Sequence, residues 1–146
     1  MRLHILIVAA VLALTACSKP PLLANSTPVE VWRGGDDGLT ARFADALEAA
    51  FRQAPEFSPN IGKIPGTLIV TIPTNLIWRR VANRTEVTYS VEFTDVTSQS
   101  LGTSRGICME DQLQNCAARV LKDAKALRME LAGDPGDRAG DPVPGR

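Results

Sequence analysis

Histidine, the side chain most often used for general acid–base catalysis, occurs only once in this chain. The chain has 146 residues, three cysteines and a single histidine, His4. His4 lies in an apolar segment, residues 1–16, that we expect to be removed from the mature protein. The mature chain then has no imidazole, which excludes Ser-His-Asp and Cys-His catalysis and any metal site that needs a histidine ligand.

The most site-like cluster of polar residues is the segment Gly34-Gly35-Asp36-Asp37-Gly38. A calcium loop needs oxygen ligands at alternating positions and a distal bidentate carboxylate, whereas this segment has only two adjacent aspartates. A phosphate-binding loop would continue with Gly-Lys-Ser or Gly-Lys-Thr, and the aspartates would repel phosphate. We interpret the segment as a turn that caps a helix, and we expect neither a metal site nor a cofactor.

Paired carboxylates could cleave a glycosidic bond without histidine. The acidic residues, however, are scattered over faces that we expect to contact solvent, and a domain of about 100 residues leaves little room for a substrate cleft. Serines such as Ser90, Ser98 and Ser104 have no activating base near them in the sequence. We therefore predict that the protein is not an enzyme, with a cell-wall hydrolase as the least favoured alternative.

The amino-terminal segment has the pattern of an export signal. Arg2 supplies a positive charge, and an apolar run of ten residues extends from Ile5 to Leu14. Because a bilayer-spanning helix needs roughly 20 apolar residues, this run predicts a cleavable signal peptide over residues 1–16. Residues 17–28, which include Pro20, Pro21 and Pro28, are typical of an extended tether.

The end of this signal resembles that of bacterial lipoprotein precursors, because Leu14-Thr15-Ala16-Cys17 is similar to a lipobox. The resemblance implies cleavage after Ala16 and attachment of diacylglycerol to the Cys17 thiol, so that buried acyl chains hold the protein at a membrane. Ser18, in place of an aspartate, implies the outer membrane with the domain facing the periplasm, and the inner membrane is the alternative. An ordinary secretory signal with a chance cysteine is the competing interpretation.

Cys108 and Cys116 are the two cysteines that remain once Cys17 is lipidated. Export would place them in an oxidising compartment, where two thiols eight positions apart usually pair. We expect a disulfide between them, with a contribution to stability of about 2–3 kcal/mol. A reactive dithiol is the alternative, although the spacing is not Cys-x-x-Cys and no histidine is near.

The first half of the mature chain predicts one strand and one helix, followed by an interrupted strand region. Residues 29–32 form a short strand, and Asp36 or Asp37 caps a helix whose apolar stripe ends at Pro55. We expect residues 56–65 to form a loop. The segments 67–72 and 76–81 are either one strand with a bulge or two short strands, because Pro73 interrupts them.

The second half contains the clearest patterns. Residues 87–94 alternate between apolar and polar with period two, which predicts a strand whose apolar face meets the helices. A turn at 97–99 and a weaker strand over 101–107 follow. Apolar residues then recur every three or four positions from Leu113 to Leu131, which predicts an amphipathic helix, and residues 133–146 have the composition of a flexible tail.

The sequence therefore predicts one α+β domain over residues 29–132, with element order β-α-β-β-β-α and two helices on one face of a small, mainly antiparallel sheet. This order, together with the segment Phe43-Ala44-Asp45-Ala46-Leu47-Glu48-Ala49-Ala50-Phe51 before a strand pair, is similar to the periplasmic domains typified by the TolB amino-terminal domain and LpoB-type lipoproteins. The resemblance implies a docking module for envelope machinery and transfers no binding residue.

The strongest candidate for partner binding is the hairpin that contains Trp78, Arg79 and Arg80, with Arg84 close by. Tryptophan and arginine are enriched at binding hot spots, and Pro73 favours an edge position from which a strand could meet a partner. Two alternatives stay open. Trp78 could be a core residue with solvated arginines beside it, or the basic hairpin could contact anionic lipid or lipopolysaccharide phosphates.

The mature chain is close to neutral, with 15 Lys and Arg against 16 Asp and Glu after residues 1–16 are removed. This balance and the aromatic content of 5% argue against nucleic-acid binding. The expected function is that of a lipid-anchored, non-catalytic adaptor of the bacterial envelope that binds another envelope protein. The alternative is a carrier or sensor for a small ligand or lipid, which requires an apolar pocket.

Overall fold

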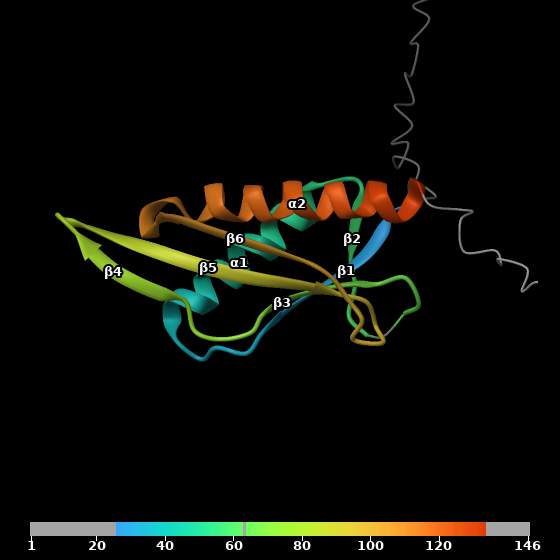
Figure 1. Ribbon diagram of the computed structural model, residues 1–146, viewed down its shortest axis with the longest axis horizontal. Coiled ribbons are helices and arrows are strands. Elements are labelled where there is room, and N and C mark those ends of the chain that lie inside the picture. The colour runs from blue at the N-terminus through green and yellow to red at the C-terminus, as the bar shows by residue number, and fades with distance from the viewer. Residues whose placement is uncertain (1–25, 63, 134–146) are drawn as a thin grey trace, which may run out of the picture.

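The computed structural model describes residues 26–62 and 64–133 (Figure 1). The predicted signal peptide, Cys17, most of the predicted tether and the tail from residue 134 lie outside the described residues. The described chain is an α+β fold with a mixed sheet and two long helices, which confirms the predicted class. The strands are β1 (Thr27–Arg33), β2 (Phe57–Pro59), β3 (Leu68–Ile72), β4 (Ile77–Val81), β5 (Arg84–Thr94) and β6 (Ser100–Met109).

Strand β5 organises the sheet because it is long enough to pair with three other strands. β6 runs antiparallel along one side of β5, whereas β3 and β4 share the other side. β3 pairs with the carboxyl-terminal half of β5, and β4 pairs with its amino-terminal half. β1 is parallel to β3 and β2 is parallel to β1, so among the described residues β4 has a neighbouring strand on only one side.

The structure differs from the predicted element order in the segment after the first helix. Residues 57–59, which fall within the predicted loop 56–65, form β2 by pairing with the start of β1. The interrupted region is two strands, β3 and β4, separated at Pro73 to Leu76. β1 begins at Thr27, so the last two residues of the predicted tether are strand, and the second helix ends at Gly133, one residue beyond the predicted domain.

Helix α1 (Gly38–Gln53) begins where the sequence predicted, because Asp37 is its N-cap. The Asp37 carboxylate accepts hydrogen bonds from the backbone amides of Leu39 (2.8 Å) and Thr40 (2.9 Å) and from the Thr40 hydroxyl (2.7 Å). These bonds, led by that from the hydroxyl, hold the pKa of Asp37 below its ordinary value. The turn that the sequence suggested at residues 34–38 is therefore a helix cap.

The lowered pKa of Asp37 predicts a specific loss of stability in acid. The ionised cap stabilises the fold above the ordinary aspartate pKa, and this contribution is lost as the pH falls through the lower value of the folded state. Asp37→Asn keeps an oxygen acceptor but cannot titrate. We expect it to melt a few degrees below the wild type at neutral pH, with the difference disappearing by about pH 2 in thermal unfolding followed by circular dichroism. Parallel curves at every pH would contradict this prediction.

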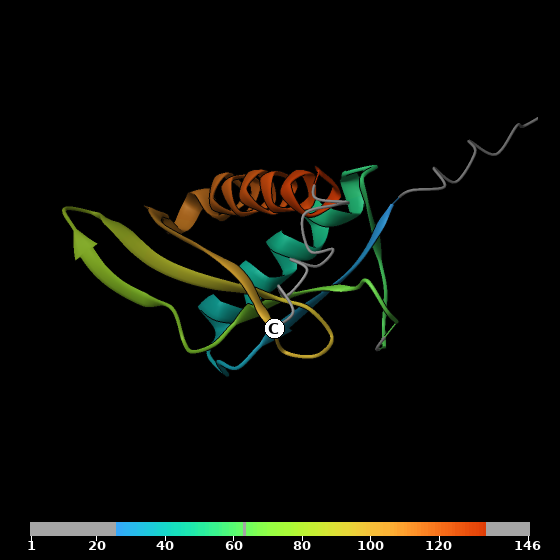
Figure 2. The same cartoon turned by 45° about the vertical axis from the view of Figure 1, so that its right-hand side comes forward.

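The hydrophobic core lies between the sheet and the two helices, α1 and α2 (Leu113–Gly133), which cover the same face of the sheet (Figure 2). Val87, Tyr89, Val91 and Phe93, the apolar members of the period-two pattern, are all buried, which confirms the predicted inward face of β5. Phe43 of α1 lies against Tyr89, with ring centroids 5.3 Å apart. Burying side chains of this size contributes roughly 1.5–3 kcal/mol each.

Strand β6 is tied to α2 by a disulfide and by polar contacts. Cys108 of β6 and Cys116 of α2 are bonded, with Cα atoms 6.1 Å apart, which confirms the predicted pairing. The Ser104 hydroxyl donates a hydrogen bond to Asp123 (2.5 Å), and Arg119 donates one to the carbonyl of Ile107 (3.1 Å). A short 3-10 turn, η1 (Glu110–Gln112), joins the strand to the helix.

Candidate partner-binding surface

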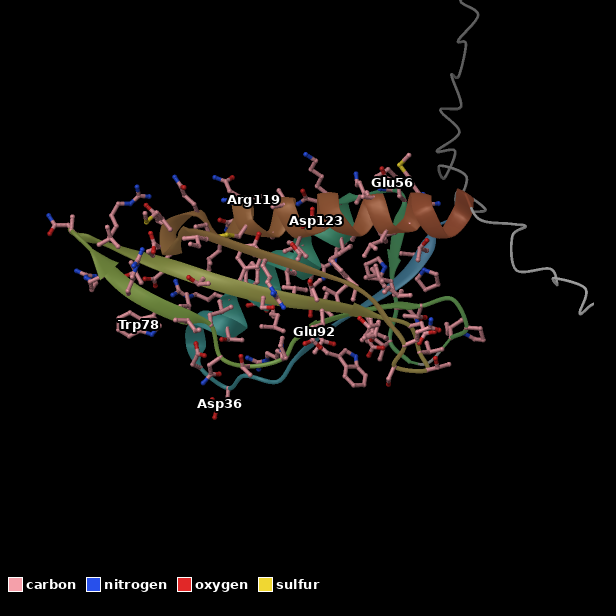
Figure 3. All side chains as sticks on the ribbon, viewed as in Figure 1. Asp36, Glu56, Trp78, Glu92, Arg119 and Asp123 are labelled. Carbon is pink, nitrogen blue, oxygen red and sulfur yellow. A yellow bond between two sulfur atoms is a disulfide. The ribbon has the colours of Figure 1, made fainter. Side chains whose placement is uncertain are left out.

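The surface around β4 differs from the rest of the sheet because every side chain of this strand is exposed. Ile77 is 73% exposed, Trp78 60% and Val81 40%. Figure 3 shows Trp78 projecting from the free side of the strand. The alternative that Trp78 is a core residue is therefore wrong. We call β4, the turn at residues 82–83 and the first half of β5 the β4 hairpin.

Both faces of the β4 hairpin are open to solvent along β4. Trp78 pairs with Val87, so its side chain lies on the face of the sheet that the helices cover farther along. Ile77 pairs with Thr88, which is on the opposite, uncovered face. Since side chains on both faces of β4 are exposed, the hairpin extends beyond the part of the sheet that the helices cover (Figure 1).

Two exposed isoleucines, one in the β4 hairpin and one in β6, lie on the uncovered face of the sheet. Ile77 of β4 and Ile107 of β6 flank Thr88 of β5, because both pair with it. They line a groove of about 370 Å³, together with residues 74–76 and Arg105. Ile107 is 49% exposed and was missed by the sequence reasoning, because its role depends on which strand β6 pairs with.

The arginines of the β4 hairpin are largely neutralised by carboxylates. Arg79 pairs with Glu86 across the hairpin (2.5 Å), and Arg84 donates to both oxygens of Asp111 at 2.7 and 2.9 Å. Arg42 of α1 pairs with Glu110. With Arg80, four arginines face three carboxylates, so the surface is nearly neutral rather than strongly basic. This balance favours a protein partner over a phosphate-rich surface.

Glu110 shows how closely these groups interact. Hydrogen bonds from the Arg42 guanidinium and the Thr85 hydroxyl, and then the charges of Arg42 and Arg80, hold the pKa of Glu110 below its ordinary value. Arg80 differs from Arg42, Arg79 and Arg84, because no ion pair within 4.0 Å is seen for it among the described residues. Of these four arginines, Arg80 has the charge that is most available to another molecule.

A tight backbone junction fixes the β4 hairpin to the domain. The amide of Gly34 donates to the carbonyl of Ile72 (2.7 Å), and the amide of Asp36 donates to the side-chain oxygen of Asn75 (2.9 Å). The amide of Leu76 donates to the buried Thr40 hydroxyl (3.0 Å). The chain between β3 and β4 is thus bound to both the end of β1 and the start of α1, which sets the direction of the hairpin.

The β4 hairpin lies at the end of the domain opposite to the predicted anchor. Thr27, near the first described residue, accepts a hydrogen bond from Arg128 near the end of α2 (2.9 Å). Figure 1 shows the start of β1 and the end of α2 together at one end of the long axis, with the hairpin at the other end. Residue 26 is nine positions from Cys17, so a tether at Cys17 would enter at the end far from Trp78.

Other kinds of functional feature are not seen in the described residues. Among residues 26–62 and 64–133, no group of three or more His, Cys, Asp or Glu side chains is placed to hold a metal ion. None of the helices in this part of the chain is both long and apolar enough to cross a membrane. Fully buried side chains, including Phe43, Leu47 and Phe93, fill the space between helices and sheet that a carrier would need as a pocket.

Comparison with known proteins finds likeness only at the level of structure. No protein-family model matches the chain, and no curated protein matches it. TolB from Acinetobacter baumannii is similar over 79% of this chain and 30% of its own, at 18% identity and a TM-score of 0.45. A minor lipoprotein from Acinetobacter baumannii is similar over 75% of this chain and 94% of its own, at 10% identity and a TM-score of 0.34. The chain thus spans less than a third of the TolB chain, and its function must be argued from its own surface.

Proposed function

We propose that this protein is a lipid-anchored, non-catalytic accessory protein of the bacterial envelope, facing the periplasm from the outer membrane, that binds another envelope protein through the β4 hairpin. The observation that carries the proposal is that all five residues of β4, including Ile77 and Trp78, are exposed in a strand that has an open edge. Exposed apolar surface next to polar groups is typical of protein-binding sites.

The position of the hairpin supports the anchored arrangement. With Cys17 acylated, the tether would meet the domain at the start of β1, and the β4 hairpin would point away from the membrane. The nine residue steps from Cys17 to residue 26 could reach roughly 28 Å if extended. A partner in the periplasm or bound to the cell wall would then meet Trp78 without obstruction from the lipid surface.

The proposal is tested by photo-crosslinking in the native host with the full-length protein. A photoreactive amino acid in place of Val81, at the tip of β4, should yield adducts with an envelope protein. The same amino acid in place of Lys122, an exposed residue of α2, is the matched control and should yield few adducts. Intact-mass analysis of the same preparation should show acyl chains on Cys17. A protein that carries no acyl chain and is found in the soluble fraction would contradict the anchored part of the proposal.

Trp78→Ala is expected to reduce the adducts formed from position 81 by at least about tenfold, because a tryptophan at the centre of an interface commonly contributes 2 kcal/mol or more. The melting temperature should change little, since the Trp78 side chain is mostly exposed in the free protein. Arg79→Ala should have a smaller effect, because Arg79 is already paired with Glu86. Adducts that are unchanged in both folded variants would contradict a binding role for the hairpin.

A further inference from the structure

The free edge of β4 has a defined set of unused backbone groups. The two-residue turn at Ala82 and Asn83 joins Val81 to Arg84, and such a turn closes on a hydrogen-bonded pair. Because the pairs alternate, the backbone groups of Arg79 also face β5, whereas those of Trp78 and Arg80 face away from it. Two N–H and two C=O groups therefore point outward from the edge.

The opposite edge of the sheet is protected, which makes the β4 edge distinctive. The same alternation directs the carbonyl of Ile107 outward from β6, and Arg119 of α2 donates a hydrogen bond to it at 3.1 Å. A long side chain thus covers part of the β6 edge, as expected for strands that must not pair with other chains. No comparable contact to the backbone of Trp78 or Arg80 is seen within the described part of the chain.

We propose that the β4 edge pairs with the β4 edge of a second copy of this chain, antiparallel and about a twofold axis at Arg79. In this register Trp78 lies opposite Arg80 of the second copy, and Ile77 lies opposite Val81 of the second copy. The outward backbone groups of Trp78 and Arg80 then face each other, as a hydrogen-bonded pair requires. This is also the register in which all five residues of β4 have a partner.

The side chains are complementary in this arrangement. The Arg80 guanidinium, which unlike Arg79 and Arg84 has no ion pair seen among the described residues, meets the indole of Trp78, and Ile77 meets an apolar valine. The two Arg79 residues at the axis would repel each other if unpaired, but each is neutralised by Glu86 of its own hairpin. Sliding the register by two residues would place either Arg80 opposite Arg80 or Trp78 opposite Trp78, and both slides would leave two residues of β4 unpaired in each copy.

This inference rests on the proposed function, because the contact between the two copies is small and its strength depends on both copies being anchored in one membrane. Five residues from each copy are far fewer than the roughly 20–30 a side of a standard interface. Two copies anchored in one membrane have a much higher effective concentration than two free copies. Edge pairing leaves both faces of the joined hairpins open, so the dimer and an envelope partner could be bound together.

The test is disulfide crosslinking of the full-length protein in its native membrane. In the proposed register two Arg79→Cys residues face each other as a non-hydrogen-bonded pair, with Cα atoms about 4.5 Å apart, a distance that a disulfide spans. Mild oxidation should give about tenfold more dimer than in Arg105→Cys. Arg105→Cys is the matched control, because it makes the same substitution at an exposed position on β6, on the other side of β5 from the β4 edge.

Two further variants test the register and the edge. Ile77→Cys and Val81→Cys should crosslink to each other when co-expressed, and each should crosslink poorly alone. Adding Arg80→Pro to Arg79→Cys should abolish the dimer, because proline removes an outward N–H and leaves the pairing with β5 intact. An unchanged melting temperature would show that the proline variant is folded.

The outcomes separate this inference from the proposed function. If Arg79→Cys gives only monomer, or no more dimer than Arg105→Cys, pairing of second copies is overturned. If Arg79→Cys instead crosslinks to a different envelope protein, the second copy is again overturned and the adaptor function is supported. If the dimer forms while no envelope protein is captured from Val81, the pairing stands and the adaptor function fails.

Discussion

Removal of the disulfide in a Cys108→Ala/Cys116→Ala variant is expected to lower the free energy of unfolding by about 2–3 kcal/mol. The bond closes a short loop between the end of β6 and the first turn of α2, so its loss gives the unfolded chain more freedom. Both cysteines are buried, so we choose alanine as the replacement, because serine would place an unpaired hydroxyl in the core. Equilibrium unfolding in urea at neutral pH measures the change.

A reductant provides the control for this prediction. Dithiothreitol should move the urea midpoint of the wild type close to that of the double variant, and it should leave the variant unchanged. Loss of the disulfide should destabilise the end of the domain that carries the β4 hairpin more than the rest. The reason is that η1 follows Cys108 closely and carries Glu110 and Asp111, the ion-pair partners of Arg42 and Arg84. Equal urea midpoints for the wild type and the variant without reductant would show that the bond contributes nothing measurable.

The parts of the fold that the sequence predicted well are those specified by local patterns. Period-two alternation identified the inward face of β5 from Val87 to Phe93, because burial on one face of a strand repeats every second residue. The helix stripe of Phe43, Leu47 and Phe51 identified the buried face of α1, and an aspartate before the stripe identified its cap. The export setting predicted that the two cysteines would pair.

The features that were missed depend on contacts between distant segments. β2 has three residues and ends in Pro59, so it is a strand only because it pairs with the start of β1. The exposure of Trp78 could not be predicted either, since it depends on where β1 and α1 end relative to the hairpin. Gly106 illustrates the same point, because a Cβ there would lie 2.6 Å from the Tyr89 hydroxyl, and only the strand pairing brings the two together.

The candidate binding surface was predicted by residue type but not by geometry. Trp78 and the neighbouring arginines were correctly identified as the residues of a hairpin, and their enrichment at interfaces follows from their chemistry. The pairing of Arg79 with Glu86 and of Arg84 with Asp111 neutralises a surface that looks basic in the sequence. Only the register of the strands shows that Arg80 is the arginine left most available.

Gly34→Ala is expected to destabilise the fold by about 1–3 kcal/mol, because the added methyl group has no space. A Cβ at Gly34 would lie 2.3 Å from the carbonyl oxygen of Pro73 and 3.0 Å from its carbon, and these are backbone atoms that cannot turn aside. Moving the chains apart would break the hydrogen bond from the Gly34 amide to Ile72 (2.7 Å). Urea unfolding measures the loss.

Gly38→Ala is the matched control, since a Cβ there meets nothing within 4 Å and alanine favours a helix more than glycine does. It should be neutral or slightly stabilising. Because the junction at Gly34 directs the β4 hairpin, Gly34→Ala should also reduce photo-crosslinking from Val81 under conditions where the variant is still mostly folded. A variant that loses stability but keeps full crosslinking would show that the hairpin binds its partner independently of how the junction holds it.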